Sequence, residues 1–286
     1  MLHILFDSWN SYGIHPFYPF NNKWFYGDLV FIVEPFLWFA FAAPLFFIFH
    51  SKWTRFTLIG VIATVPLLAA YNGLLTWYSV AATFSFALIT SFFAQRAKTV
   101  SRKILAGVTA AILFLATQSF TAMKVREQLN ASFEPQSPKH KIIDPVLSAL
   151  PANPFCWSVI QLEVDQANDK YITISKIVSS WPTLLAAESC PVFRAPAGRA
   201  EMELSEFVAI TEKDCYVDAW LRFSRAPFFE NSLASDLRFA QRQISNFSNL
   251  EISSDKRYCP RFIPPWSRPR QDILDAPIRG QAKTNP

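Results

Sequence analysis

The sequence predicts an α-helical membrane bundle of about four transmembrane helices, followed by a small α+β soluble domain. The first observation is charge: residues 1–122 hold seven basic and three acidic side chains, whereas the rest of the chain holds 20 and 19. The second is proline, because only five of the 20 prolines precede residue 123. We therefore expect a membrane domain over residues 1–122 and a turn-rich soluble domain over residues 123–286.

Four long apolar segments lie in the first part of the chain, at residues 29–49, 56–71, 74–93 and 104–122. A helix crosses a bilayer with about 20 mostly apolar residues, so each segment is a candidate span. The second and third segments are joined by a short turn at Asn72-Gly73 and should form a helical hairpin. A soluble all-helical core is the alternative, and four segments with so little charge disfavour it.

The loops between these segments predict the orientation of the bundle. Lys52 and Arg55 lie in the first connection, and four basic residues lie in the third, within residues 95–103. Because basic loops stay in the cytoplasm, we expect the start of the chain, the turn at Asn72 and everything after residue 122 outside. Two basic residues shortly after residue 122 oppose this orientation weakly.

All four cysteines lie in the second half of the chain, at Cys156, Cys190, Cys215 and Cys259. An even number in one domain is typical of disulfides in an oxidising compartment, which agrees with an outer location. Four unrelated buried thiols are the alternative. The sequence leaves the pairing of the four cysteines open.

All three acids of the membrane half, and two of the four histidines, fall within the first 34 residues. Ionisable groups at membrane depth are costly, so their clustering predicts a functional site. His3 and Asp7 are four positions apart, which places both on one face of a helix, where they can bind a divalent metal ion such as zinc. A plain hydrogen bond or a capping Asp7 is the alternative.

Asp28 and Glu34 are the other two acids of this region. Asp28 directly precedes the first apolar segment, where a carboxylate can cap the helix. Glu34 lies inside that segment, so its carboxyl group must be protonated, paired or bound to a ligand. Both are candidates for a catalytic role, with capping alone as the alternative for Asp28.

The intervening segment, residues 8–28, is rich in aromatic residues separated by Pro, Gly and Asn. Trp and Tyr favour the headgroup level, so this segment should lie along the outer membrane interface. It either anchors the chain there or forms a lid that brings His15 and Asp28 over the His3/Asp7 pair. In the second case His15 can supply a third metal ligand.

The second half of the chain predicts secondary structure in this order: a helix at 142–150, strands at 157–164 and 171–178, a helix at 199–210, and strands at 216–223 and 237–240. The tail from Pro260 should be irregular. We expect His140 in a solvated loop, and neither a G-x-S-x-G motif nor a Gly-rich phosphate loop occurs. The near balance of charge argues against nucleic-acid binding, which needs a concentrated basic face.

Several short motifs together resemble one known family. They are H-I-L-F-D (3–7), S-Y-G (11–13), H-P-F (15–17), P-F (19–20), W-F-Y-G-D (24–28), L-V-F-I-V-E-P (29–35), P-A-N-P-F-C-W (151–157) and D-L-R-F (236–239). The combination resembles the YdjM-type family of predicted membrane-bound metal-dependent hydrolases, in its proteobacterial branch. The resemblance is strongest over residues 3–35.

The resemblance implies a metal-dependent hydrolase of the bacterial inner membrane, and the orientation predicted from the basic loops then makes its C-terminal domain periplasmic. His3 and Asp7 are then the metal ligands, with Asp28 and Glu34 as further ligands or general base, and a metal-bound water is the nucleophile. A site at the outer interface suggests a lipid-linked or envelope substrate. The alternative is a non-enzymatic protein whose helices lie in the lipid bilayer and whose outer domain binds a partner or an envelope component.

Members of this family carry further histidine motifs before the H-x-x-x-D motif, with which this sequence nearly begins. Catalytic zinc sites usually use three protein ligands, so the histidines seen here are few for such a site. We expect either an N-terminal truncation, through a misplaced start or a fragment, or a protein that has lost the activity.

Overall fold

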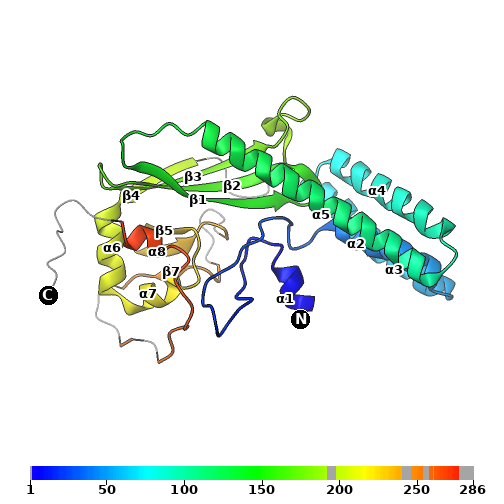
Figure 1. Cartoon of the computed structure of the whole chain (residues 1–286), viewed down its shortest axis with the longest axis horizontal. Coiled ribbons are helices and arrows are strands. Elements are labelled where there is room, and N and C mark those ends of the chain that lie inside the picture. The colour runs from blue at the N-terminus through cyan, green and yellow to red at the C-terminus, as the bar shows by residue number, and fades with distance from the viewer. Residues whose placement is uncertain (1, 192–197, 240–245, 254–257, 260, 277–286) are drawn as a thin grey trace.

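The computed structural model describes residues 2–191, 198–239, 246–253, 258–259 and 261–276. The molecule is elongated, with a bundle of helices at one end and the strands, covered by short helices, at the other (Figure 1). The long helix α5 (Val100–Ala131) runs from the bundle onto the sheet and connects the two ends.

The other helices of the first half are α1 (Leu2–Asp7), α2 (Pro35–Ile48), α3 (Lys52–Tyr71) and α4 (Trp77–Arg96). Ser51, Thr76 and Thr99 begin α3, α4 and α5 by accepting backbone N–H groups of the first turn. These three helices are long and apolar enough to cross a membrane. Helix α2 has 14 residues, about 21 Å, so by length it falls short of the apolar core of about 30 Å.

Helix α2 packs against α3, α4 and α5 through buried aromatic and small side chains. Phe36 stacks on Phe114 of α5, with ring centroids 4.9 Å apart. One turn further, Gly107 approaches α2 so closely that a Cβ at this position would collide with the carbonyl oxygen of Ala40. The bundle is therefore held by close backbone packing, as is common between membrane helices.

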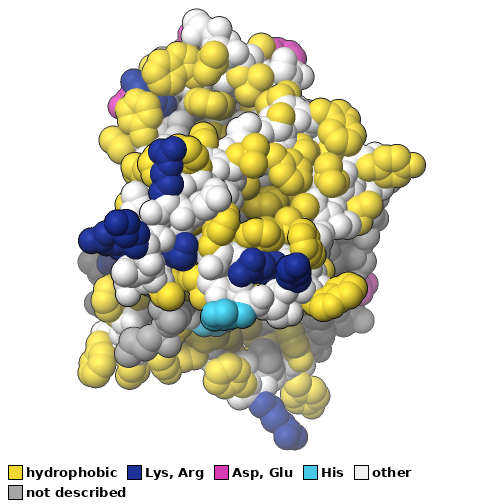
Figure 2. All heavy atoms as spheres, turned by 90° about the vertical axis from the view of Figure 1, so that its right-hand side faces the viewer, with side chains coloured by type: hydrophobic (Ala, Val, Ile, Leu, Met, Phe, Trp, Pro, Cys, Tyr) yellow, Lys and Arg dark blue, Asp and Glu magenta, His cyan; other side chains and the backbone are white. Residues whose placement is uncertain are grey.

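The end of the bundle that lies farthest from the sheets is basic. Figure 2 shows Lys and Arg side chains gathered on this end, among exposed hydrophobic side chains. The basic residues at these helix ends are Lys52, Arg55, Arg96, Lys98, Arg102 and Lys103. The opposite ends of α3 and α4, at Tyr71 and Trp77, face the sheet-bearing region.

A four-stranded antiparallel sheet has the order β1-β2-β3-β4, with strands β1 (His140–Leu150), β2 (Asn153–Asp165), β3 (Lys170–Ser179) and β4 (Gly198–Glu203). The last turns of α5 lie on it, where Val125 and Leu129 pack against Trp157 in a fully buried cluster. A second, three-stranded sheet contains β5 (Pro227–Glu230), β6 (Leu233–Asp236) and β7 (Leu250–Glu251). The remaining helices are η1 (Ala187–Ser189), α6 (Leu204–Lys213), α7 (Cys215–Leu221) and α8 (Gln271–Leu274).

Several predicted elements of the second half differ from the structure. The strands expected at 157–164 and 171–178 are confirmed within β2 and β3. The helix expected at 142–150 is strand β1, and the strand expected at 216–223 is mostly helix α7. The helix expected at 199–210 begins only at Leu204, after β4, and residues 237–239 follow the end of β6. In the tail, α8 interrupts the expected irregular structure.

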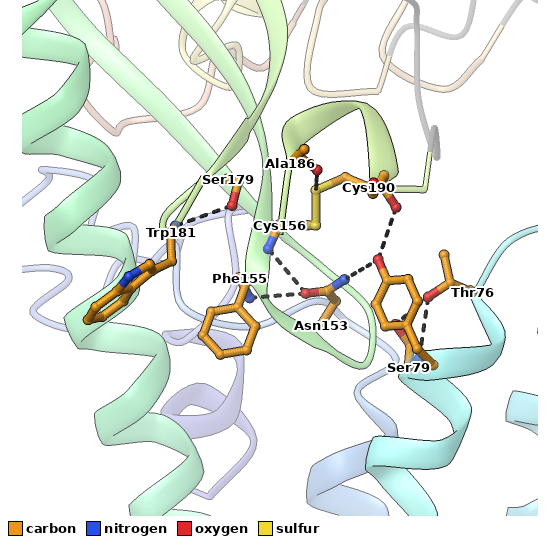
Figure 3. The surroundings of a disulfide bond; sticks show 11 residues. Thr76, Ser79, Asn153, Phe155, Cys156, Ser179, Trp181, Ala186 and Cys190 are labelled. Carbon is orange, nitrogen blue, oxygen red and sulfur yellow. Dashed lines mark hydrogen bonds between the residues drawn. A yellow bond between two sulfur atoms is a disulfide. The ribbon is translucent and has the colours of Figure 1, made fainter. Parts of the chain in front are cut away.

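All four cysteines form disulfides, which selects one of the two alternatives left open by the sequence. Cys156 of β2 pairs with Cys190, directly after η1 (Figure 3). Cys215, the first residue of α7, pairs with Cys259. The first disulfide closes the loop after β3 onto the sheet, and the second fastens the C-terminal segment to α7.

Candidate functional site

The His3/Asp7 pair forms as the four-residue spacing predicts. Both side chains lie on one face of α1, with His3 Nε2 3.1 Å from Asp7 Oδ2. The pair is open to solvent, since the His3 side chain is 90% exposed and that of Asp7 43%. This geometry allows either a hydrogen bond or two ligands to a metal ion.

Asp28 is the centre of a buried ionic network. Its backbone has φ +55°, and its side chain is 1% exposed. Arg225 donates to both carboxylate oxygens, at 2.7 and 3.0 Å, and Arg126 of α5 donates at 2.9 Å. The expected cap of the first apolar helix is therefore an ion-pair acceptor for two arginines from distant parts of the chain.

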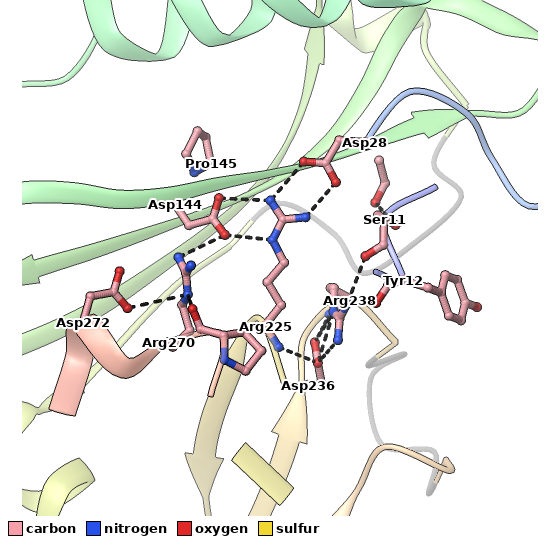
Figure 4. A network of polar contacts seen from close by, with 12 residues as sticks. Ser11, Tyr12, Asp28, Asp144, Pro145, Arg225, Asp236, Arg238, Arg270 and Asp272 are labelled. Carbon is pink, nitrogen blue, oxygen red and sulfur yellow. Dashed lines mark hydrogen bonds and ion pairs between the residues drawn. The ribbon is translucent and has the colours of Figure 1, made fainter. Parts of the chain in front are cut away.

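Asp144 of β1 extends this network. Arg225 donates to both of its oxygens, at 2.8 and 3.1 Å, and Arg270 lies 3.0 Å away (Figure 4). Although burial opposes ionisation, the guanidinium groups of Arg225 and Arg270 hold the pKa of Asp144 below its usual range. Burial also opposes the charge of Arg225, but the ion pairs with Asp28 and Asp144 raise its pKa. Charges removed from water are stable only when paired in this way.

A second buried arginine, Arg238, fastens the N-terminal loop to the end of β6. Its guanidinium donates to the carbonyl oxygens of Ser11 and Tyr12, at 2.9 and 2.8 Å, and pairs with Asp236 at 2.7 Å. The ring of Tyr26 lies against both arginines, with the guanidinium carbon of Arg225 4.1 Å from the ring centroid. Cation–π contact therefore adds to the ionic attachment of this loop.

Glu34 joins the start of α2 to the turn between β1 and β2. Its Oε1 accepts the N–H of Phe36 at 3.2 Å, which makes Glu34 the N-cap of α2. Both carboxylate oxygens also accept the N–H of Ala152, at 3.3 and 3.4 Å. Glu34 is 1% exposed, so a buried carboxyl group is satisfied by backbone donors of both regions.

His15 lies in an aromatic cluster, away from the ionic network. Its ring centroid is 3.9 Å from that of Trp24 and 5.0 Å from that of Trp266. Trp24 in turn donates to the carbonyl oxygen of Arg222 at 2.8 Å. Burial lowers the pKa of His15, which favours a neutral, stacked ring. The loop is therefore attached to the C-terminal segment by this cluster.

The described residues do not fit the donor set of a catalytic metal. Within these ranges of the chain, no three His, Cys, Asp or Glu side chains are grouped so that they could hold a metal ion. His3 and Asp7 provide two donors, whereas catalytic zinc usually has three. Asp28 and Glu34 are already bound by arginines and by backbone N–H groups. The metal and the site residues stay predictions.

The sequence did not identify the arginines of the network. Arg126, Arg225 and Arg270 come from α5 and from two C-terminal segments, and nothing local distinguishes them from surface arginines. Asp144 is the residue that could have indicated the network, because it is an acid within the apolar sequence of β1. The expectation for His140 was wrong, because its ring is buried and lies 2.9 Å from Glu163 in the sheet.

The first part of the chain matches the model of a known family. The model of the family described as YdjM inner membrane protein matches residues 1–83. This stretch includes α1, the aromatic loop, α2 and α3, and it ends within α4. The resemblance is thereby confirmed for this part, and the resemblance of the later motifs stays a prediction. Neither the curated proteins nor the solved structures contain a match to the chain.

Proposed function

We propose, from the match of residues 1–83 to a family of inner membrane proteins, that this chain is a membrane-anchored protein of the bacterial inner membrane. Its helices anchor the sheet-bearing region at the periplasmic face, where that region binds a partner or an envelope component. This proposal is the non-enzymatic alternative of the two that the sequence left open.

The proposal rests on the hydrogen bonds that the two buried acids, Asp28 and Glu34, accept. Asp28 accepts hydrogen bonds from two arginines, and Glu34 caps α2 while it accepts the N–H of Ala152. A general base must come within hydrogen-bond reach of the substrate, and the Asp28 side chain and Glu34 are each only 1% exposed. Both acids instead join the N-terminal loop to the sheet-bearing region, which favours a structural role.

Two further observations support the periplasmic side for the sheet-bearing region. The basic residues gather at the far end of the bundle (Figure 2), and basic helix ends stay in the cytoplasm. The Cys156–Cys190 and Cys215–Cys259 disulfides both lie in the sheet-bearing region, and such bonds persist in the oxidising periplasm.

The hydrolase is the second candidate, and the exposed His3/Asp7 pair favours it. In that case the pair binds a divalent metal, and the substrate is lipid-linked or an envelope component. A further ligand would have to come from outside the described residues or from a second molecule.

Metal content distinguishes the two candidates. The full chain is purified in detergent, dialysed against zinc and then against buffer, and its metal is measured by mass spectrometry. The anchor predicts no stoichiometric zinc in the wild type. The hydrolase predicts stoichiometric zinc that is lost in His3→Ala and Asp7→Ala. His50→Ala is the matched control, because His50 is an exposed histidine at the other end of the bundle.

A further inference from the structure

A small pocket lies between α5 and the segment that follows β3. Lys124, Ser180, Trp181, Pro182 and Thr183 line it, and its volume is about 230 Å³. Trp181 extends from the end of β3 toward α5 (Figure 3), where its ring centroid lies 6.5 Å from that of Phe120. The pocket therefore has one wall on a membrane helix and the other on the sheet-bearing region.

The length of α5 places this pocket at a membrane interface. Lys103 and Lys124 are 21 positions apart on one continuous helix, which corresponds to about 32 Å along its axis. The apolar core of a bilayer is about 30 Å thick. If Lys103 lies at the cytoplasmic headgroup level, Lys124 lies at the headgroup level of the outer leaflet.

Exposed aromatic side chains lie at the pocket and at the ends of α3 and α4 opposite to their basic ends. Tyr71 at the end of α3 is 81% exposed, Trp77 at the start of α4 63%, and Trp181 46%. The hydroxyl of Tyr78 donates to the carbonyl oxygen of Ser189 at 3.0 Å, so the start of α4 lies beside the loop that continues from the pocket. Tyr and Trp concentrate at membrane–water interfaces.

Ser180 gives the pocket an unsatisfied polar group. It is 3% exposed, and its Oγ has no hydrogen-bond partner among the described residues. Both backbone polar groups of Ser180 are hydrogen-bonded. Its N–H donates to the carbonyl oxygen of Phe155 at 2.8 Å, and its carbonyl oxygen accepts from Gln128 Nε2 at 3.2 Å. A buried hydroxyl without a partner is costly, and a bound ligand would satisfy it.

Lys124 supplies a positive charge to the same pocket. Its ammonium lies 3.4 Å from Glu127 on the exposed side of α5 and 5.9 Å from the ring centroid of Phe120, and an exposed ion pair of this kind is weak. We propose that the pocket binds the phosphate of an outer-leaflet phospholipid headgroup. Lys124 Nζ and Ser180 Oγ bind the phosphate oxygens, Thr183 adds a hydroxyl, and Trp181 packs against the glycerol.

Lipid titration of the full chain in detergent, followed by native mass spectrometry, tests this site. The probes are phosphatidylglycerol and diacylglycerol, which has the same chains but no phosphate. We expect Lys124→Gln to weaken phosphatidylglycerol binding roughly tenfold and Ser180→Ala to weaken it by a smaller factor. Lys139→Gln is the control, since it removes an exposed lysine from the loop before β1.

The outcomes separate the possible ligands. The proposal requires that Lys139→Gln binds as the wild type, and that diacylglycerol binds more weakly than phosphatidylglycerol. Wild-type affinity in Lys124→Gln would overturn it. Displacement of the lipid by inorganic phosphate at similar concentrations would also overturn it, because the pocket would then be a site for free phosphate. Because the Lys124 side chain is 43% exposed, we expect Lys124→Gln to fold. The affinity of this variant therefore decides the test even if Ser180→Ala is unstable.

Discussion

Arg225 donates two hydrogen bonds to Asp28, at 2.7 and 3.0 Å, across 197 positions of the sequence. The same guanidinium binds Asp144 of β1. One arginine thus connects the N-terminal loop, the first sheet and the segment before β5 in a single buried site. An acid that the sequence proposes for catalysis is the point at which the two halves of the chain are joined.

Removal of the Asp28 charge should unfold this junction. Asp28→Asn leaves Arg225 with Asp144 as its remaining carboxylate and takes the paired carboxylate away from Arg126, and removal of one partner of a buried ion pair typically costs about 3–5 kcal/mol. We expect a large drop in the urea midpoint of the detergent-solubilised protein. Asp7→Asn is the control, because its exposed pair with His3 contributes little. Equal stability of the two variants would refute the junction.

Glu34 should tolerate an amide better than truncation. Glu34→Gln keeps one oxygen that can accept the N–H of Phe36 or Ala152, whereas Glu34→Ala leaves both donors buried and unpaired. We expect Glu34→Ala to lose roughly 1–3 kcal/mol for each donor left without a partner, and Glu34→Gln to lose clearly less. The measurement is the thermal midpoint of both variants, and an equal loss in both would argue for a role of the charge itself.

Acid should weaken the junction through Asp144. Its pKa is lowered in the folded state, with burial opposing and Arg225 and Arg270 favouring the ionised form. Its stabilisation is therefore present above the ordinary Asp value and is lost as the pH falls through the lowered value. Unfolding free energies measured from about pH 6 to about pH 3 should fall more steeply in the wild type than in Asp144→Asn. Identical slopes would contradict this assignment.

Substitution of two glycines in the bundle by alanine should change the stability of the protein in opposite directions. A Cβ on Gly107 collides with the carbonyl oxygen of Ala40, whereas one on Gly60 has open space around it. Gly107→Ala should push α2 away from α5 and destabilise the protein. Gly60→Ala should gain up to about 1 kcal/mol of helix propensity. Thermal midpoints in the same detergent give the comparison, and a neutral Gly107→Ala would mean that the two helices are less closely packed.

The sequence predicted the membrane helices more reliably than the sheets. Length and lack of charge identify α3, α4 and α5 directly, because a bilayer imposes both. Strand β1 was mistaken for a helix because its last five residues are all buried. A strand covered on both faces gives a continuous apolar run, which periodicity cannot distinguish from a buried helix. Helix α7 was missed because its cap, Asp214, was not recognised.

The candidate site could be predicted only in part. The sequence identified Asp28 and Glu34 as acids in an apolar setting that need partners, and both are buried and bound. It could not identify those partners, because Arg126 and Arg225 lie 98 and 197 positions from Asp28. Local spacing predicts pairs such as His3 and Asp7 on one helix, whereas the ionic network depends on the tertiary fold.

The side of the membrane on which the sheet-bearing region lies tests the account most directly. A protease site inserted after Glu134, in the exposed loop between α5 and β1, can be cleaved only from the side where the sheets lie. We predict complete cleavage by protease added to intact spheroplasts, with a cytoplasmic marker protein left uncut. Cleavage that occurs only after detergent lysis would place the sheets in the cytoplasm and contradict a periplasmic function.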